Sequence, residues 1–303
     1  MTENDPLISE LSEGRKRFLA LVADVRPELH RYCTRMIGSI ADGEDIVQET
    51  LARAYYALTE FESVPPLRAW LFRIAHNRAL DYMRRYEHRM GQPLSEMQDH
   101  VVDANPSPED ALAHSQAIRV AVSRFVELAP TQRSCVILKD VLGHSLEEIA
   151  VLLELSVPAV KAALHRGRES LRDRLQMVPE TGLPQQFSTA VVRYTALFNA
   201  RDWEGVRAML AEDVRLDLIS RSQRTGRHDV GHYFTNYAKI EGWRLVPVWL
   251  DDREVIAVFR HADDARPGYF IELGWNSGRI VTIRDFRYVP YVMQEAEIRG
   301  MSF

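Results

Sequence analysis

The segment from Ser145 to Leu175 constrains the fold of this chain most, because it has the pattern of a helix-turn-helix. Ser145 with Glu148 three residues later is a capping box, which opens a short helix. We expect the chain to turn near Glu154, and Ser156 to cap a second helix with Pro158 in its first turn, where proline is tolerated. Apolar residues at helical spacing predict the buried faces: Ile149, Ala150 and Leu153, then Val160, Leu164, Leu171 and Leu175.

The second helix carries a basic face, with five Lys/Arg and two acids in residues 157–175. Small residues beside basic ones at the start of such a helix suit insertion into the major groove, where side chains near the helix N-terminus read the bases. The arginines then hold the phosphates of the DNA backbone. The predicted DNA contacts are Pro158, Lys161, Ala162, His165, Arg166, Arg168 and Arg172. The structural alternative is a solvated basic face on a plain helical hairpin.

The 303 residues fit two or three domains, and breaker residues divide them. Residues 1–85 read as helices, and 86–113 as a flexible acidic linker with six acids, one arginine and four Gly or Pro residues. Helices resume over residues 114–178. After a second boundary, residues 187–303 change pattern. We therefore expect a multidomain chain with two all-α modules followed by an α+β domain.

The last domain begins with two predicted helices, 187–200 and 203–210. Three runs rich in β-branched and aromatic residues then predict strands at 255–259, 269–275 and 280–288. Asn276-Ser277-Gly278 is typical of a hairpin turn between the last two. Helices followed by an antiparallel meander predict a separate α+β fold.

The helix-turn-helix and the residues before it resemble region 4 of sigma-70-type factors. The resemblance rests on six short motifs: 128–133, 136–140, 143–145, 148–150, 160–161 and 164–168. Their spacing is similar to that of the extracytoplasmic-function (ECF) group, which keeps only regions 2 and 4. The resemblance implies that this module reads the −35 element and docks on the flap of the polymerase β subunit.

An independent motif lies in the N-terminal module, where residues 42–50 resemble the start of region 2.2. Val47, Leu51, Ala54 and Leu58 form a predicted buried stripe, which leaves acidic and amide side chains for a basic partner. The resemblance makes that partner the clamp of the β′ subunit of core RNA polymerase. The implied contacts are Asp45, Ile46, Gln48 and Glu49. A structural alternative for Glu49 is an i,i+4 pair with Arg53.

Residues 68–85 resemble regions 2.3 and 2.4, which read the −10 element. An opened DNA strand needs cations for its backbone and polar or aromatic surfaces for its unstacked bases. The predicted contacts along this helix are Trp70, Arg73, His76, Asn77, Arg84 and Arg85. For Trp70 the structural alternative, a core position, is the favoured one. The resemblance further implies that the acidic linker threads towards the RNA exit path.

The C-terminal domain resembles SnoaL-like domains in residues 191–194, 198–203, 206–210 and 212–214. The resemblance implies a cone-shaped α+β fold in which a curved antiparallel sheet encloses a pocket, and a regulatory role within the sigma factor. The candidate pocket residues are Asp217, His228, Trp243, Trp249, Tyr269 and Asp285. We expect no enzymatic activity, since spacing assembles no nucleophile, base and orienting partner. A small-molecule sensor or an enzyme is the alternative.

The remaining features set limits on function. No run of about 18 apolar residues is present, and the polar, acidic N-terminus excludes a secretory signal, so the cytoplasm is expected. Cys33 and Cys135 have no ligand-spaced partners and are predicted to be core residues, with no metal and no cofactor. We also expect the tail, residues 289–303, to contact the sigma modules.

The sequence therefore predicts a sigma factor that binds core RNA polymerase and promoter DNA, and whose activity is modulated by its own C-terminal domain. The alternative is a freestanding helix-turn-helix transcriptional regulator, which would need neither the 42–50 motif nor the 68–85 motif.

Overall fold

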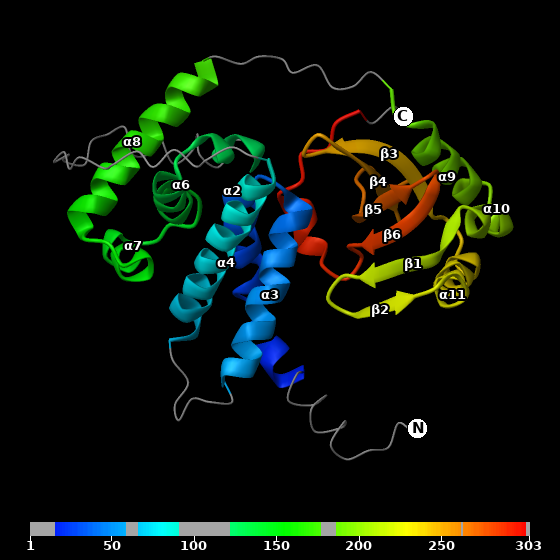
Figure 1. Ribbon diagram of the computed structural model, residues 1–303, viewed down its shortest axis with the longest axis horizontal. Coiled ribbons are helices and arrows are strands. Elements are labelled where there is room, and N and C mark those ends of the chain that lie inside the picture. The colour runs from blue at the N-terminus through cyan, green and yellow to red at the C-terminus, as the bar shows by residue number, and fades with distance from the viewer. Residues whose placement is uncertain (1–15, 59–65, 91–121, 177–185, 262, 301–303) are drawn as a thin grey trace. The chain divides into compact units, whose positions relative to one another are not determined.

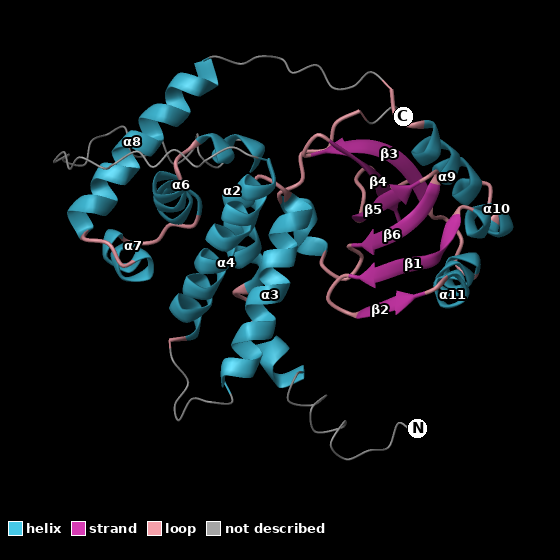
Figure 2. Cartoon of the chain, in the orientation of Figure 1, coloured by secondary structure: helices cyan, strands magenta, loops and turns pink. Residues whose placement is uncertain are grey.

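The computed structural model describes residues 16–58, 66–90, 122–176, 186–261 and 263–300 (Figure 1). The chain falls into two compact units, Met1–Pro179 and Glu180–Phe303. Figure 2 shows helices and loops in the first unit, and a sheet with helices in the second. Together they have the predicted order of all-α modules followed by an α+β domain.

The first half of unit 1 consists of the helices α2 (Arg26–Ile37), α3 (Ile40–Leu58) and α4 (Leu67–Met90). α2 begins with a proline in its first turn and ends at Gly38, whose φ of 78° is the left-handed conformation that ends many helices. α2 and α3 meet closely at Gly43, where an added Cβ would lie 2.7 Å from the Cα of Thr34. α4 continues through Met90, so the predicted linker start at residue 86 is wrong.

The second half of unit 1 holds the predicted helix-turn-helix. Its elements are η1 (Val122–Glu127), α6 (Pro130–Val136), the π turn η2 (Ile137–Val141), α7 (Leu146–Leu153) and α8 (Val157–Gln176). The capping box is confirmed, because Ser145 Oγ accepts the N–H of Glu148 and the Glu148 carboxylate accepts the N–H of Ser145. Glu154 makes the turn with a φ of 56°, and Ser156 Oγ accepts the N–H of Ala159 at 3.3 Å.

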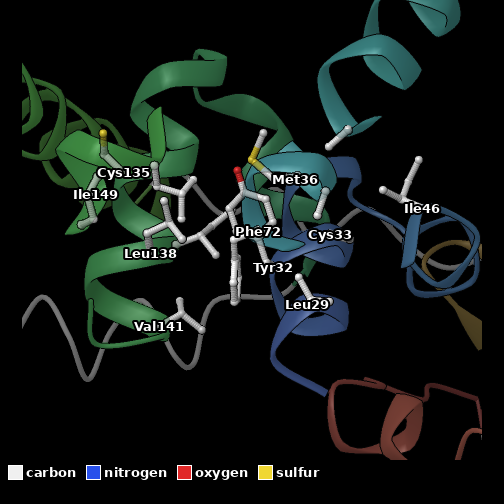
Figure 3. Close-up of a cluster of buried hydrophobic side chains, with 14 of the residues drawn as sticks. Leu29, Tyr32, Cys33, Met36, Ile46, Phe72, Cys135, Leu138, Val141 and Ile149 are labelled. Atoms are coloured by element: carbon white, nitrogen blue, oxygen red, sulfur yellow. The ribbon is translucent and has the colours of Figure 1, made fainter. Parts of the chain in front are cut away.

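One apolar core is shared by the helices of unit 1 (Figure 3). Tyr32 and Met36 of α2 and Phe72 of α4 lie in the same cluster as Leu138 of η2 and Ile149 of α7. Both cysteines are fully buried in this core, as predicted. The N-terminal helices and the helix-turn-helix therefore pack as a single body, because burial of apolar surface from both halves stabilises it.

Unit 2 is an α+β fold with the elements α9 (Thr189–Asn199), α10 (Trp203–Ala208), β1 (Leu210–Leu218), β2 (Ser222–Thr225), α11 (Arg227–Ala238), β3 (Arg244–Leu250), β4 (Arg253–Phe259), β5 (Tyr269–Asn276), β6 (Arg279–Asp285) and η3 (Pro290–Gln294). The sheet order is β2-β1-β6-β5-β4-β3. The predicted α+β class with a curved sheet is confirmed (Figure 2). The sheet is not wholly antiparallel, since the meander β3–β6 returns beside β1 in parallel.

The three predicted strands correspond to β4, β5 and β6. Their last turn is the predicted hairpin, in which Ser277 and Gly278 both have positive φ, 48° and 76°. β1, β2 and β3 were not predicted, and in β2 all four residues are exposed and show no apolar alternation. None of the described helices is long and apolar enough to cross a membrane.

The helices of unit 2 cover one face of the sheet. α9, α10 and α11 share a core with alternate residues of the strands, including Leu216 of β1 and Ile283 of β6. Side chains of a strand alternate between faces, so Asp285 lies on this helix-covered face with Ile283. Asp217 lies on the opposite face from Leu216 by the same rule.

Candidate nucleic-acid interface

The candidate −35 surface lies on α8. Pro158, His165 and Arg172 are exposed, and Lys161 and Arg166 are half-buried. Ala162 is buried, with 3% of its surface exposed, so its prediction as a base contact is wrong for this conformation. The buried face of α8 is wider than predicted, because Ala162 and Ala163 are both buried beside Val160.

Arg168 of α8 has a structural partner. Its Nε donates to Oδ2 of Asp140 at 2.9 Å, and its Nη2 donates to Oδ1 at 2.6 Å. Asp140 is 2% exposed, so this bidentate pair satisfies a buried carboxylate. Arg168 therefore holds α8 against η2, and the prediction that it contacts DNA phosphate does not fit this geometry.

The candidate −10 surface lies on α4. Arg73, Asn77, Arg84 and Arg85 are exposed, as a strand-binding surface requires. Trp70 is half-buried and packs against the core of unit 1, in line with the alternative left open for it. Arg84 also lies 3.6 Å from the Asp81 carboxylate in an exposed pair, which is weak enough to give way to a phosphate.

His76 differs from its neighbours on α4. Its Nδ1 lies 2.7 Å from Tyr32 Oη and 3.4 Å from Ser134 Oγ. Burial lowers the pKa of His76 to about 4, because the charged imidazolium loses its hydration. In this conformation a predicted −10 contact is neutral and bonded to α2 and α6.

Arg133 makes a second connection between the halves of unit 1. Its guanidinium donates to the carbonyl oxygens of Met36, Val126 and Leu128, and it is 4% exposed. Met36 is in the last turn of α2, where free carbonyls favour a cation. Arg133 lies in the motif of residues 128–133 and had no predicted role. Met36 lies 97 positions away, so no local signal could have found this contact.

The candidate polymerase surface lies on α3. Asp45 is exposed, and Gln48 and Glu49 are half-buried. Ile46 is 2% exposed and belongs to the core, so its prediction as a direct polymerase contact is wrong for this conformation. The predicted Glu49–Arg53 pair is present at 3.2 Å, and the same carboxylate oxygen accepts Nη1 of Arg78 at 3.0 Å.

The six candidate pocket residues of unit 2 do not form one site. Trp243, Tyr269 and Asp285 lie around one polar network on the helix-covered face. Asp217 lies on the other face and accepts Gln223, while His228 is exposed on α11. These two do not join the network.

Trp249 is also outside this network, because its ring stacks on Phe187 with centroids 5.3 Å apart. Tyr233 and Tyr237 of α11 complete the network and were missed by the sequence analysis. Their i,i+4 spacing predicts that they share one face of a helix, but it gives no sign of Asp285 as their partner. Within the described ranges, no group of three His, Cys, Asp or Glu side chains could hold a metal ion.

Comparison with known protein families gives one match in each half of unit 1. Residues 21–89 match the family model of sigma-70 region 2, and residues 122–171 match that of sigma-70 region 4. These regions define the class as sigma-70-type factors with regions 2 and 4.

The relatives narrow the class. The ECF RNA polymerase sigma factor SigF of Caulobacter vibrioides is 31% identical, over 48% of this chain and 77% of that protein. ECF sigma factor SigW of Bacillus subtilis is 29% identical, over 56% of this chain and 95% of its own length. The chain belongs to the ECF RNA polymerase sigma factors. An NTF2-like protein of Burkholderia pseudomallei is similar in structure at 23% identity, with a TM-score of 0.25, over 32% of this chain and 86% of that chain.

Proposed function

We propose that this sigma factor directs promoter-specific initiation by reading the −35 element with α8 and the −10 strand with α4. The observation that carries the proposal is that each helix presents exposed arginines, Arg172 on α8 and Arg73, Arg84 and Arg85 on α4. Exposed cations on two separate helices suit two separate stretches of nucleic acid.

The proposed polymerase contacts are Asp45, Gln48 and Glu49 of α3 with the β′ clamp, and the helix-turn-helix with the β flap. Asp45 is exposed, so the surface offers a carboxylate to a basic partner, and Glu49 would exchange its pairs with Arg53 and Arg78 for that partner. A factor that works on core polymerase acts in the cytoplasm.

The compact conformation of unit 1 supports a conformational step, in which its two halves separate before both promoter elements are bound. Elements named −10 and −35 are about 25 base pairs apart, which is about 85 Å of duplex at 3.4 Å per pair. A compact protein with as many residues as unit 1 has a radius of gyration of about 15 Å. The contacts of Ser134 with Tyr32 and His76 therefore have to open before both helices reach their elements.

The C-terminal unit is proposed to modulate this activity and not to catalyse a reaction. Trp249 and Arg299 exchange two backbone hydrogen bonds of 2.9 and 3.0 Å, which fasten the last described part of the tail to β3 within unit 2. That residues 289–303 contact the sigma modules stays a prediction. A catalytic role for the Asp285 network is the alternative for this unit.

The test is run-off transcription with purified core polymerase on a promoter selected by the full chain. We expect transcripts that depend on the protein and whose yield changes when the chain ends at Gln176. A chain that forms no complex with core polymerase in either form would overturn the proposal in favour of a freestanding regulator. An unchanged yield on truncation would overturn only the regulatory role of the C-terminal unit.

A further inference from the structure

A buried carboxylate organises the helix-covered face of unit 2. Asp285 is 0% exposed, and its Oδ2 accepts the hydroxyls of Tyr233 at 2.6 Å and Tyr237 at 3.2 Å. Its Oδ1 accepts the backbone N–H of Arg287 at 2.8 Å. The hydroxyls of Tyr237 and Tyr269 are 2.8 Å apart. If Tyr269 donates to Tyr237, every hydroxyl proton of these three tyrosines has an acceptor.

Two further donors beside this network have no partner among the described residues. The hydroxyl of Tyr194, a residue with 0% exposure on α9, has none, and neither does the indole Nε1–H of Trp243. A buried donor left unpaired costs about 1–3 kcal/mol, so native structures seldom keep one without a ligand or water. The Trp243 ring lies 5.2 Å from the Tyr237 ring and 6.1 Å from the Tyr269 ring.

Cations and a further aromatic ring pack against Trp243, Tyr237 and Tyr269. The guanidinium carbon of Arg287 lies 5.1 Å from the centroid of the Trp243 ring, and that of Arg260 lies 5.8 Å from the Tyr269 ring. Phe198 packs on Tyr237 with centroids 5.1 Å apart. Burial raises the pKa of the Asp285 carboxyl.

We propose that this site, built from Tyr194, Trp243 and Arg287 beside the Asp285 network, binds a small aromatic carboxylate. The two unpaired donors and the guanidinium match carboxylate oxygens, and the flat walls of Trp243 and Tyr237 match an aromatic ring. The proposal goes beyond the assigned role of the chain, because it concerns unit 2 alone and needs no polymerase.

The experiment uses the full chain with ¹⁵N-labelled tryptophan. The five tryptophans give five indole N–H resonances, and Trp243→Phe assigns one of them. The probe is 2-naphthoate, with the neutral 2-naphthalenemethanol as its uncharged match. We expect the Trp243 N–H resonance to move downfield and saturate with 2-naphthoate, and the alcohol to bind about tenfold more weakly.

Two variants test the contacts. Tyr194→Phe and Arg287→Gln should each weaken 2-naphthoate binding about tenfold. Arg215→Gln, an exposed arginine on the opposite face of the sheet, is the matched control and should bind as the parent does. A Tyr194→Phe chain with an unchanged dispersed spectrum excludes unfolding as the cause.

Three results would overturn the proposal. The Trp243 resonance does not respond to 2-naphthoate, which leaves water as the partner of both donors. The alcohol binds as well as the carboxylate, which leaves an apolar site. Arg215→Gln weakens binding as much as Arg287→Gln, which leaves only surface charge. None of these results bears on transcription, so failure here is distinct from failure of the sigma assignment.

Discussion

The hydroxyl of Tyr32 lies 2.7 Å from Nδ1 of His76, a residue 44 positions away on the helix assigned to the −10 strand. Tyr32 also lies 3.2 Å from Ser134 of the region 4 half. One side chain thus joins both promoter-reading halves. In a consistent proton assignment His76 donates to Tyr32, Tyr32 to Ser134, and Ser134 to the sulfur of Met36.

Protonation of His76 should weaken unit 1. Because the pKa of His76 is lowered to about 4 from its usual 6.5, the unfolded chain binds more protons between these pH values, and stability falls as the pH drops through that window. The slope reaches at most about 1.4 kcal/mol per pH unit. Urea unfolding at pH 5 and pH 7.5 measures it.

His76→Gln should reduce this pH dependence, whereas His228→Gln, at an exposed position, should not. Some dependence should remain, because burial also lowers the pKa of His144. An unchanged slope in His76→Gln would show that His76 is not the titrating group.

Gly43→Ala should destabilise the chain by about 2 kcal/mol or more. Helix propensity alone predicts a gain of about 1 kcal/mol in the middle of α3. The added Cβ would lie 2.7–2.8 Å from backbone atoms of Thr34, which cannot move aside without shifting α2. The thermal unfolding midpoint decides the sign, and a higher midpoint for Gly43→Ala would contradict the close crossing of α2 and α3.

Arg168 and Arg172 should separate stability from DNA binding. Arg168→Gln leaves Asp140 buried without its bidentate partner, which should cost about 3 kcal/mol of unfolding free energy. Arg172→Gln should leave stability within about 0.5 kcal/mol. It should instead reduce the salt slope of promoter binding by about one. Equal losses of stability in both variants would contradict the separate roles of Arg168 in folding and Arg172 in DNA binding.

Tyr194→Phe and Tyr233→Phe should differ in sign. Tyr194 has an unpartnered hydroxyl, so its removal should leave stability unchanged or raise it by about 1 kcal/mol. Tyr233 donates to Asp285 at 2.6 Å, so its removal should cost about 2 kcal/mol. Chemical unfolding of the two variants beside the parent measures both. A greater loss of unfolding free energy in Tyr194→Phe than in Tyr233→Phe would contradict the hydrogen bonding described for these two tyrosines.

Local patterns in the sequence predicted the features that depend on neighbouring residues, such as helix caps and tight turns. Ser145 and Glu148 lie three residues apart, so their capping box was readable, and so was the turn at Ser277 and Gly278. Ala162 was placed on the wrong face because small residues do not mark a face by their polarity.

Contacts between distant parts of the chain were not readable. Asp285 was a candidate, but its partners Tyr233 and Tyr237 lie 52 and 48 positions away on another element. Tyrosines in a domain of this kind read as ordinary core residues. The parallel pairing of β1 with β6 also depends on which strand the last strand of the meander lies beside. The spacing of apolar residues in the sequence does not indicate that neighbour.

The most direct test of the account is energy transfer between dyes on the two promoter-reading helices, attached at Tyr86→Cys on α4 and Glu169→Cys on α8. Both positions are exposed, whereas native Cys33 and Cys135 are fully buried and should not react. We predict high transfer in the free chain, and low transfer once core polymerase and promoter DNA are both bound. High transfer in a complex that makes transcripts would contradict the account.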